Sequence, residues 1–368
     1  MSAPEVDIVV EQLRRRLPGG IGTYCRGLLR GLRALGGEAP RVRLRASRPG
    51  RRPDPLAGEG FPLRASALPG PLLTRCWDRG LPLGFSSRRP AIVHATSLAF
   101  PPVGSGLVAM VHDLAWRRFP EAYPSRGLAW HEAALARLAA RAELYVVPSE
   151  LTAADLLGAG LGVTADRVRV VAEGLDHLAP PDLEAARAFL EGCGLAPERP
   201  FLLTVSTLEP RKNLARLCQA YASVRPELPE PWPLVVVGPA GWGEGGVAPA
   251  PGVVAAGPAD EGVLSGLYVL SRLVAYVPLF EGFGLPAGEA MAAGTPVVAS
   301  RDLPSTAGAC IEVDPADLSS LAAGLLEGAL EERRRAELRA RGLERAAQLT
   351  WEQAARAHVA AWREVAGR

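Results

Sequence analysis

The stretch that decides the fold is Glu281-Gly-Phe-Gly-Leu-Pro-Ala-Gly-Glu289, followed directly by Ala290-Met-Ala-Ala-Gly-Thr-Pro-Val-Val298. An apolar run at 273–277 precedes it and a second one at 296–299 ends it, and both read as buried strands. A helix is expected between them over 288–293. Because two parallel strands need a crossover connection, which is usually a helix, this stretch predicts an α/β fold with a parallel sheet.

The same alternation extends over the rest of the chain. Expected strands are 6–10, 92–95, 107–111, 144–147, 168–171, 201–206, 234–237 and 253–256, and expected helices are 21–35, 127–141, the segment after Ser149, 213–224, 318–330, 331–345 and 351–365. At 368 residues the chain suits two domains. We predict two Rossmann-like domains, with the boundaries 1–178 for the N-terminal domain, 179–199 for a Pro-containing linker, 200–350 for the C-terminal domain and 351–368 for a last helix.

Composition and charge narrow the class of protein. The hydrophobic content of 48% and the charged content of 22% are ordinary for a globular protein, and the net charge of +2 says little about partners. No nucleic-acid partner is expected. Residues 1–60 nevertheless contain twelve arginines and only six acidic residues, and many of these arginines lie between Arg41 and Arg52. This excess is either a solvated basic face or a surface that attracts an anionic acceptor or an anionic membrane.

The cysteines and the N-terminus indicate the compartment. The five cysteines are far apart in the sequence and include no C-x-x-C pair, so neither a zinc site nor a disulfide framework is expected. Glu5 and Asp7 stand where a signal peptide would be apolar, and no apolar run reaches the roughly 18 residues of a membrane span. A cytoplasmic protein is expected, at most peripheral at the inner face of the membrane.

Lys212 is the only lysine of the chain and Asn213 is its only asparagine. Together with Arg211 they follow a buried strand and open a helix, so two cations stand near a positive helix end. Such a pair is suited to a diphosphate, whose negative charge grows as it leaves a sugar. The alternative is a salt bridge with Glu209 at the start of the helix.

The two glutamates of the 281–289 stretch lie eight positions apart across a turn from loop to helix. Carboxylates accept hydrogen bonds from sugar and ribose hydroxyls, so Glu281 and Glu289 can address two parts of one ligand. Gly282 and Gly284 leave the backbone between them open to close approach. The alternative is a helix-capping Glu289 and a Glu281 without a role.

Taken together, these motifs resemble those of the family 4 retaining glycosyltransferases with the GT-B architecture, and most closely bacterial mannosyltransferases of surface-polysaccharide assembly. The resemblance spans nearly the whole chain and rests on 210–213, 281–289, 290–298, 110–114, 147–150, 173–176 and the last helix from Trp351. It implies two domains that face each other across a cleft, with the last helix crossing back onto the N-terminal domain.

The resemblance also implies a role for each candidate residue. Catalysis would involve His112, Glu281, Arg211 and Lys212, and donor binding would involve Gly19, Gly20, Arg211, Lys212, Gly282, Phe283, Gly284, Leu285 and Glu289. The cation pair would hold the diphosphate, the first glutamate and the glycine loop would contact the sugar, and the second glutamate would bind the ribose. The two N-terminal glycines would close over the phosphates. His112 would orient the reacting sugar; its alternative role is that of a core histidine, which is the favoured role for His94.

The expected donor is GDP-mannose, followed by UDP-sugars and dTDP-sugars, with the base read by loops near 238–242 and 257–261. The acceptor would be a glycan, a lipid-linked glycan or a small molecule. No D-x-D motif occurs, so no metal and no other cofactor is expected, and Arg211 and Lys212 would supply the charge instead. No nucleophilic carboxylate for a double displacement is evident, and the resemblance implies a front-face route in which the leaving phosphate helps to deprotonate the acceptor.

Two departures from the family pattern concern the phosphate loop. Gly288 stands where the family usually has leucine before the second glutamate, and Pro304-Ser305-Thr306 stands where an acidic residue is frequent. Other functions also stay open at this stage. They are an NAD-dependent oxidoreductase, for which Gly20-Ile21-Gly22 lacks the third glycine; a GT-B epimerase; a phosphorylase, whose Schiff-base lysine would have to be Lys212; and a sugar-nucleotide-binding protein without activity.

Overall fold

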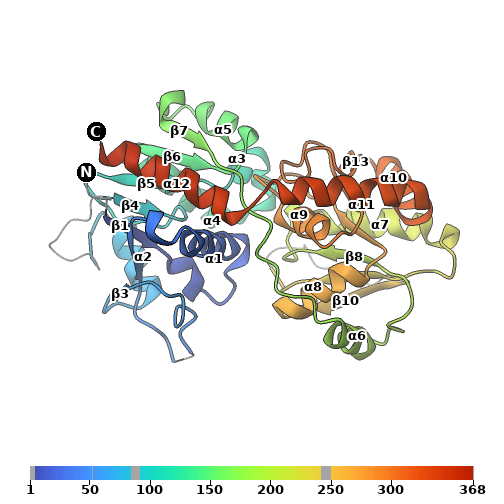
Figure 1. The fold of residues 1–368 in the computed structure, drawn as a ribbon. Helices are drawn as coiled ribbons and strands as arrows, with labels where there is room; N and C mark the ends of the chain where they lie inside the picture. The colour runs from blue at the N-terminus through green and yellow to red at the C-terminus, as the bar shows by residue number, and fades with distance from the viewer. Residues whose placement is uncertain (1–4, 52, 84–91, 242–249, 368) are drawn as a thin grey trace. The chain divides into compact units, whose positions relative to one another are not determined.

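The computed structural model describes residues 5–51, 53–83, 92–241 and 250–367. They form two compact units (Figure 1). The first consists of Met1–Arg118, Pro124–Gly174 and Trp351–Arg368, and the second of Phe119–Tyr123 and Leu175–Thr350. Each unit is built around one parallel sheet with helices packed on it, so the predicted α/β fold with two domains is confirmed.

The sheet of the first unit has the strand order β3-β2-β1-β4-β5-β6-β7. Its strands are β1 (Glu5–Val9), β2 (Arg41–Ala46), β3 (Leu63–Ala65), β4 (Ile92–Ala95), β5 (Leu107–Met110), β6 (Leu144–Val147) and β7 (Val168–Val170). Its helices are α1 (Gly19–Ala34), α2 (Gly70–Asp78), α3 (Ala115–Arg118), α4 (Ser125–Ala139), α5 (Glu150–Leu157) and α12 (Trp351–Ala366). The order reverses between β1 and β4, so the loops after these strands leave room for a ligand at the carboxyl edge.

The sheet of the second unit has the order β10-β9-β8-β11-β12-β13. Its strands are β8 (Leu202–Val205), β9 (Leu234–Val237), β10 (Val253–Gly257), β11 (Leu273–Tyr276), β12 (Val297–Ser300) and β13 (Ile311–Val313). Its helices are α6 (Leu183–Gly192), α7 (Leu214–Val224), α8 (Glu261–Leu270), α9 (Leu285–Ala292), α10 (Leu318–Leu330) and α11 (Glu332–Ala347). Here the order reverses between β8 and β11, and the loops after these two strands carry the candidate residues 208–213 and 278–289.

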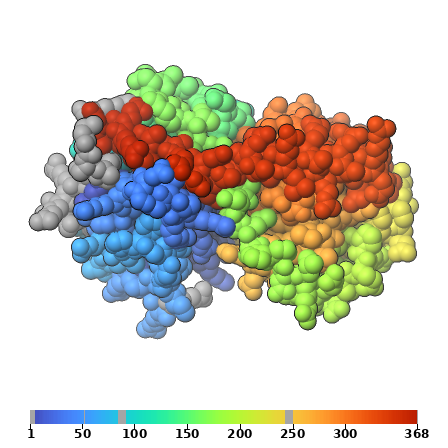
Figure 2. Space-filling model, viewed as in Figure 1, coloured from blue at the N-terminus to red at the C-terminus, as the bar shows by residue number. Residues whose placement is uncertain are grey.

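The C-terminal helix α12 belongs to the first unit, where it packs on α1. Glycines on α1 allow this contact: a Cβ atom on Gly27 would meet the ring of Trp351 at 2.0 Å, and one on Gly31 would meet the Trp351 carbonyl oxygen at 2.0 Å. Trp351 and Trp362 are fully buried in the core that also contains residues of β1 and β5. Figure 2 shows the outer side of α12 (red) at the surface, beside blue residues of the same unit. The last segment of the chain thus completes the core of the unit that begins with the first segment.

Strands β2, β3 and β13 lie outside those that the sequence predicts, and β2 gives two arginines of the basic run at 41–52 a structural role, while Arg41, Arg48 and Arg51 are exposed. Arg43 and Arg45 donate through Nε to the two carboxylate oxygens of Asp7, at 2.8 and 2.7 Å. Asp7 lies fully buried on the neighbouring strand β1. These two arginines therefore neutralise a buried carboxylate and do not form a solvated basic face. Contact with an anionic membrane and a cytoplasmic location stay predictions.

The segment 179–199, expected to be a linker, is part of the second unit. Its helix α6 packs on α8, where a Cβ atom on Gly266 would meet the Asp182 carbonyl oxygen at 2.6 Å and the Cβ atom of Ala186 at 2.7 Å. The backbone N–H of Asp182 also donates to the carbonyl of Gly262 at 3.0 Å. Within the described part of the chain, each helix is too short or too polar to cross a bilayer.

Candidate active site

The segment after β8 carries the two predicted cations. The chain forms a short 3-10 turn, η5 (Pro210–Lys212), and then enters α7. Asn213 joins the two elements with a left-handed backbone (φ 61°), which asparagine adopts more readily than most residues. Its amide nitrogen donates to the carbonyl oxygens of Val277 and Pro315 at 3.0 and 2.8 Å. The only asparagine of the chain is therefore explained by the geometry of this junction.

Arg211 and Lys212 converge on one carboxylate. Arg211 Nη1 lies 2.8 Å from Glu281 Oε1, and Lys212 Nζ lies 2.5 Å from the same oxygen. Arg211 Nη2 also lies 2.9 Å from Glu209 Oε1. Each of these four side chains is at most 12% exposed. The salt bridge to Glu209 is thus present, and it coexists with a second carboxylate that binds both cations.

The charges of this cluster fix its protonation at neutral pH. Burial alone would raise the pKa of the Glu281 carboxyl, but Arg211 and Lys212 lower it to about 2. Burial and the charge of Glu281 raise the pKa of Tyr276 well above its ordinary value, so its hydroxyl stays neutral and accepts from Lys212 Nζ at 3.1 Å. Burial also raises the pKa of Glu209 against the effect of Arg211. Because both cations are paired with Glu281, an anionic ligand would have to displace this carboxylate to bind them.

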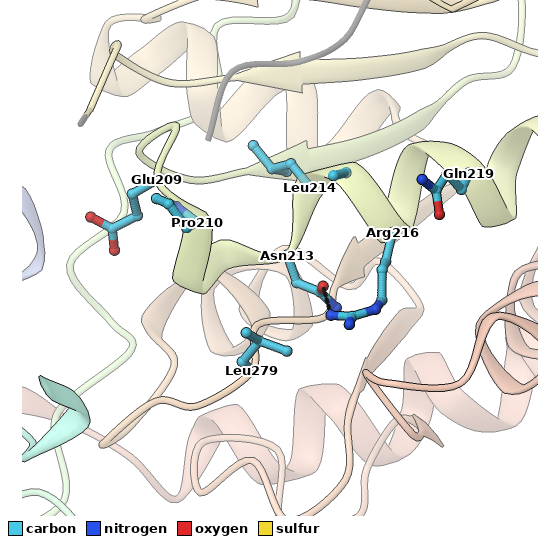
Figure 3. A pocket seen from close by; sticks show the side chains of 8 residues that line it. Glu209, Pro210, Asn213, Leu214, Arg216, Gln219 and Leu279 are labelled. Carbon is cyan, nitrogen blue, oxygen red and sulfur yellow. Dashed lines mark hydrogen bonds between the residues drawn. The ribbon is translucent and has the colours of Figure 1, made fainter. Parts of the chain in front are cut away.

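A cavity of about 370 Å³ lies beside this segment (Figure 3). Its lining consists of Glu209, Pro210, Asn213, Leu214, Ala215, Arg216, Gln219 and Leu279. Arg216 is held there by a hydrogen bond from Nη1 to Asn213 Oδ1 at 3.1 Å. Of the four charged side chains in the cluster, Glu209 lines the cavity and Arg211, Lys212 and Glu281 do not, so the cavity adjoins the cluster.

The glycine loop 282–285 leads from Glu281 into α9. Gly284 has a left-handed backbone (φ 92°), and a Cβ atom there would meet Leu303 Cδ1 at 2.7 Å, so the position requires glycine. Ser305 donates from its backbone N–H to the carbonyl of Phe283 at 3.0 Å and from Oγ to the carbonyl of Gly284 at 2.8 Å. The segment 304–306, which lacks the acidic residue of the family pattern, thus holds the loop through neutral hydrogen bonds. Phe283 and Leu285 are buried side chains that anchor it.

Glu289 is separate from the ion cluster and has its own partners. Tyr268 donates its hydroxyl to Glu289 Oε2 at 2.8 Å, and His177 Nε2 lies 2.9 Å from Oε1. Burial and the neighbouring carboxylate raise the pKa of Tyr268 well above its ordinary value, so the phenol remains a donor. Each oxygen of Glu289 keeps capacity for one more donor, such as a ribose hydroxyl. The sequence indicated neither Tyr268 nor His177 as a partner.

Gly288, the second departure from the family pattern, has a packing reason. A Cβ atom there would lie 2.5 Å from Leu175 Cδ2 and 2.8 Å from Leu175 Cδ1. Leu175 is buried, and it fills the space that a side chain at 288 would take. Glycine at 288 therefore lets α9 pack against Leu175, and Glu289 keeps its position on this helix.

In the first unit, Gly19, Gly20 and His112 lie at the carboxyl edge of the sheet. Gly19 and Gly20 are exposed and form the first turn of α1, so the helix does not pair their backbone N–H groups. His112 follows β5; its Nε2 lies 3.0 Å from the carbonyl oxygen of Thr96, and its Nδ1 lies 3.4 Å from Glu173 Oε1. Glu173 is buried and was not predicted as a partner.

His94 lies in the core of the first unit. It is fully buried, and burial holds its pKa well below its ordinary value. Its Nε2 lies 2.9 Å from the hydroxyl of Tyr24, which also lies 2.8 Å from His358 Nε2 on α12. These contacts describe a structural histidine. Of the segments expected to read the base, 238–241 follows β9 and 257–261 connects the end of β10 to the start of α8, while Trp242 lies outside the described residues.

Comparison with protein families gives two matches. Residues 18–177 match the model described as Glycosyltransferase Family 4, and residues 199–328 match the model described as Glycosyl transferases group 1. Together the matches extend from residue 18 to residue 328 with a gap at 178–198, which includes most of the segment 179–199 discussed above.

Individual relatives agree with these matches. O-antigen chain mannosyltransferase B of Escherichia coli is 29% identical over 274 residues, which are 71% of this chain and 71% of that protein. The structure of Anabaena Alr3699/HepE in complex with UDP and glucose has a TM-score of 0.71 at 17% identity and covers 96% of this chain and 97% of its own. WaaG, a glycosyltransferase involved in lipopolysaccharide biosynthesis, has a TM-score of 0.66 at 15% identity and covers 99% and 100%. At these identities the two structural likenesses concern the fold.

Proposed function

Because the chain belongs to the family 4 glycosyltransferases with the GT-B architecture, we propose that it moves a hexosyl group from a nucleoside-diphosphate sugar to a hydroxyl acceptor with retention of configuration. The observation that carries this proposal is the cluster of Arg211, Lys212 and Glu281 at the carboxyl edge of the second sheet. A donor of this class brings a diphosphate and sugar hydroxyls, which need cations and a carboxylate in one place.

Donor binding would exchange the partners within the cluster. The diphosphate takes the place of Glu281 beside Arg211 and Lys212, and the freed carboxylate accepts from hydroxyls of the donor sugar. In this exchange both cations keep an anionic partner and the freed carboxylate keeps hydrogen-bond donors, which matters because a buried charge without either is costly. Glu289, held by Tyr268 and His177, accepts from the ribose. The roles predicted for Gly19, Gly20 and His112 are part of the same proposal.

The chemistry of transfer would rest on these cations. Negative charge grows on the diphosphate as the bond to the sugar breaks, and Arg211 and Lys212 stabilise it, so the reaction needs no divalent metal. Glu281 is ionised beside Arg211 and Lys212 in the structure, with a pKa of about 2, and its proposed role is to bind the donor. The leaving phosphate takes the proton of the acceptor hydroxyl on the same face, which retains the configuration.

GDP-mannose is the proposed donor, supported by the E. coli mannosyltransferase among the relatives. The acceptor is a glycan, a lipid-linked glycan or a small molecule with a free hydroxyl. An epimerase of the same fold would turn the donor over without any acceptor, so the need for an acceptor separates the two functions. An NAD-dependent oxidoreductase is less favoured, because Gly20 and Gly22 lie inside the first turns of α1 and do not form a loop before it.

Thermal shift and turnover test the proposal. Among GDP, UDP and dTDP, GDP should raise the melting temperature most, because a ligand that binds only the folded state stabilises it.

Lys212→Ala and Glu281→Ala should each lower acceptor-dependent release of GDP by about 100-fold or more, in line with the loss of a transition-state contact. EDTA should leave the rate unchanged. Arg333→Ala, which removes a cation that is 95% exposed on α11, is the matched control. Turnover close to that of the unchanged protein in Lys212→Ala or Glu281→Ala would contradict the proposal.

A further inference from the structure

Ser305 of the second unit makes two hydrogen bonds to the glycine loop 282–285. Its backbone N–H donates to the carbonyl oxygen of Phe283 at 3.0 Å, and its hydroxyl Oγ donates to the carbonyl oxygen of Gly284 at 2.8 Å. Ser305 is fully buried, so water competes little for either bond. Two successive carbonyl groups of the loop therefore point towards one residue.

The same two bonds determine where the next two backbone N–H groups point. All peptide bonds within the described residues are trans, and in a planar trans peptide the N–H points away from the C=O. The N–H of Gly284 shares a peptide plane with the carbonyl of Phe283, and the N–H of Leu285 shares one with the carbonyl of Gly284. Both N–H groups are therefore directed away from Ser305.

Neither of these two N–H groups has an acceptor within the described part of the chain, although Gly284 and Leu285 are both buried. A buried backbone N–H without a partner is rare in folded proteins. Gly284 has a left-handed backbone (φ 92°, ψ 53°) and Leu285 directly begins α9. Successive N–H groups at such a turn form a concavity that suits an anion, so a phosphoryl oxygen would supply the acceptor that the chain does not.

The surroundings hold Ser305 in place. Arg345 of α11 donates through Nε to the carbonyl oxygen of Ser305 at 3.2 Å. The next residue, Thr306, donates through its backbone N–H and its Oγ1 to the carbonyl oxygen of Leu303, at 3.1 and 2.9 Å. A serine is also chemically suited to the contact with Gly284, because the acidic residue of the family pattern, once ionised, could not donate to a carbonyl oxygen.

We propose that Ser305 is a positioning residue that, through these two bonds, directs the N–H groups of Gly284 and Leu285 at the diphosphate of the donor. This inference rests on the proposed function, and it adds two neutral donors to the cations Arg211 and Lys212. Negative charge grows on the diphosphate as the bond to the sugar breaks. Donors that are fixed in advance should therefore stabilise the transition state more than the bound donor.

Amide NMR tests the direction of the N–H groups without an assay of activity. Phe283-Gly284 is the only Phe-Gly pair of the chain, so protein with ¹³C-carbonyl phenylalanine and ¹⁵N-glycine gives one carbonyl-coupled amide signal, that of Gly284. Pyrophosphate and GDP should each move its proton signal downfield, and guanosine, which has no phosphate, should not. In Ser305→Ala the movement should be smaller, because the N–H of Leu285 is no longer held to share the same phosphate.

A Gly284 signal that neither pyrophosphate nor GDP moves would overturn the proposal, as would an equal movement in Ser305→Ala. Ser265→Ala is the matched control, since Ser265 is 2% exposed in the same unit and its hydroxyl donates to the carbonyl of Glu261 on its own helix at 3.0 Å. It should leave the response of the Gly284 signal unchanged. If Ser305→Ala does not fold, Ser305→Cys, whose thiol is a weaker donor, takes its place.

Kinetics separate positioning from general damage. With transfer established, Ser305→Ala should lower kcat about tenfold or more with a smaller change in the donor KM, while Ser265→Ala should leave both unchanged. An equal loss of kcat in the two variants would contradict the role of Ser305. If no transfer is found but the Gly284 signal responds to pyrophosphate and less so in Ser305→Ala, the proposed function fails and this inference holds.

Discussion

Replacing Gly288 by alanine tests how the second glutamate of the motif is positioned. The residue lies in α9 directly before Glu289. The added Cβ atom would lie 2.5 Å from Leu175 Cδ2 and 2.8 Å from Cδ1, distances that Cβ atoms in real structures essentially never show. Leu175 is 1% exposed and its backbone N–H donates to the carbonyl of Leu349 at 2.8 Å. Because side chain and backbone of Leu175 are both held, the strain must move α9 or the leucine.

Two opposing effects set the magnitude. Alanine is better than glycine in a helix by about 1 kcal/mol. Overpacking a filled core costs about 1–3 kcal/mol, and two contacts below 3.0 Å belong in the upper part of that range. We expect a net loss of about 1–2 kcal/mol. At about 2–4 °C per kcal/mol for a unit of this size, the second unit should melt about 2–8 °C lower. The donor KM should rise as well, because Glu289 follows the shifted residue.

Calorimetry with and without GDP measures the effect, since a nucleotide that binds the second unit identifies its transition. Leu175→Ala removes the obstacle, so the double variant with Gly288→Ala should lose less stability than the two single changes added together. Gly192→Ala is the matched control, because Gly192 ends α6 in the same unit and an added Cβ atom there meets nothing within 4 Å. Unchanged melting of Gly288→Ala, or strict additivity with Leu175→Ala, would refute the reasoning.

The remaining predictions concern pH. Arg211 and Lys212 outweigh burial and lower the pKa of Glu281 from 4.5 to about 2, so this carboxylate stabilises the second unit fully above about pH 4.5 and loses that effect as the pH falls towards 2. Glu281→Gln should flatten the decline of the melting temperature over this range; an unchanged slope would contradict the assignment. Burial lowers the pKa of His358 from 6.5 to about 4, so the unfolded chain binds more protons between these values and the first unit loses stability as the pH falls from 6.5 to 4. His358→Gln should reduce the difference in melting temperature between about pH 7 and pH 5, and an equal difference in both proteins would count against it.

The parallel fold could be predicted because a strand buried on both faces is a continuous apolar run. The runs at 92–95, 144–147 and 234–237 match β4, β6 and β9 residue for residue. β2 escaped prediction because arginines alternate in it with apolar residues, and only the buried Asp7 on β1 explains why charges stand inside a sheet. β3 is three residues long and partly exposed at the edge of the sheet, so it carries little pattern of its own.

The candidate site likewise has residues that the sequence predicted and residues that only the structure reveals. Arg211, Lys212, Glu281 and Glu289 were identified because they lie in contiguous motifs whose spacing is visible in the chain. Their partners come from long-range contacts: His177 is 112 residues from Glu289 in the sequence, and Tyr268 is 21 residues away. No periodicity links such residues: Tyr268 reaches Glu289 from α8, and His177 reaches it from the segment before α6. A sequence motif thus predicts which groups could meet a ligand, and the structure is needed to identify the side chains that hold those groups.

The geometry also explains why the only lysine of an arginine-rich chain stands at 212. Its Nζ lies 2.5 Å from Glu281 Oε1, 3.1 Å from the hydroxyl of Tyr276 and 5.6 Å from the centre of the Tyr276 ring. One compact ammonium meets both a carboxylate and a hydroxyl, because its three donors diverge. A planar guanidinium would leave N–H groups without acceptors at a side chain that is 12% exposed, which costs free energy. Arg211 has the opposite requirement, since its fork bridges the carboxylates of Glu209 and Glu281. The chain therefore has arginine at 211, where a forked guanidinium bridges two carboxylates, and lysine at 212, where a compact cation is needed.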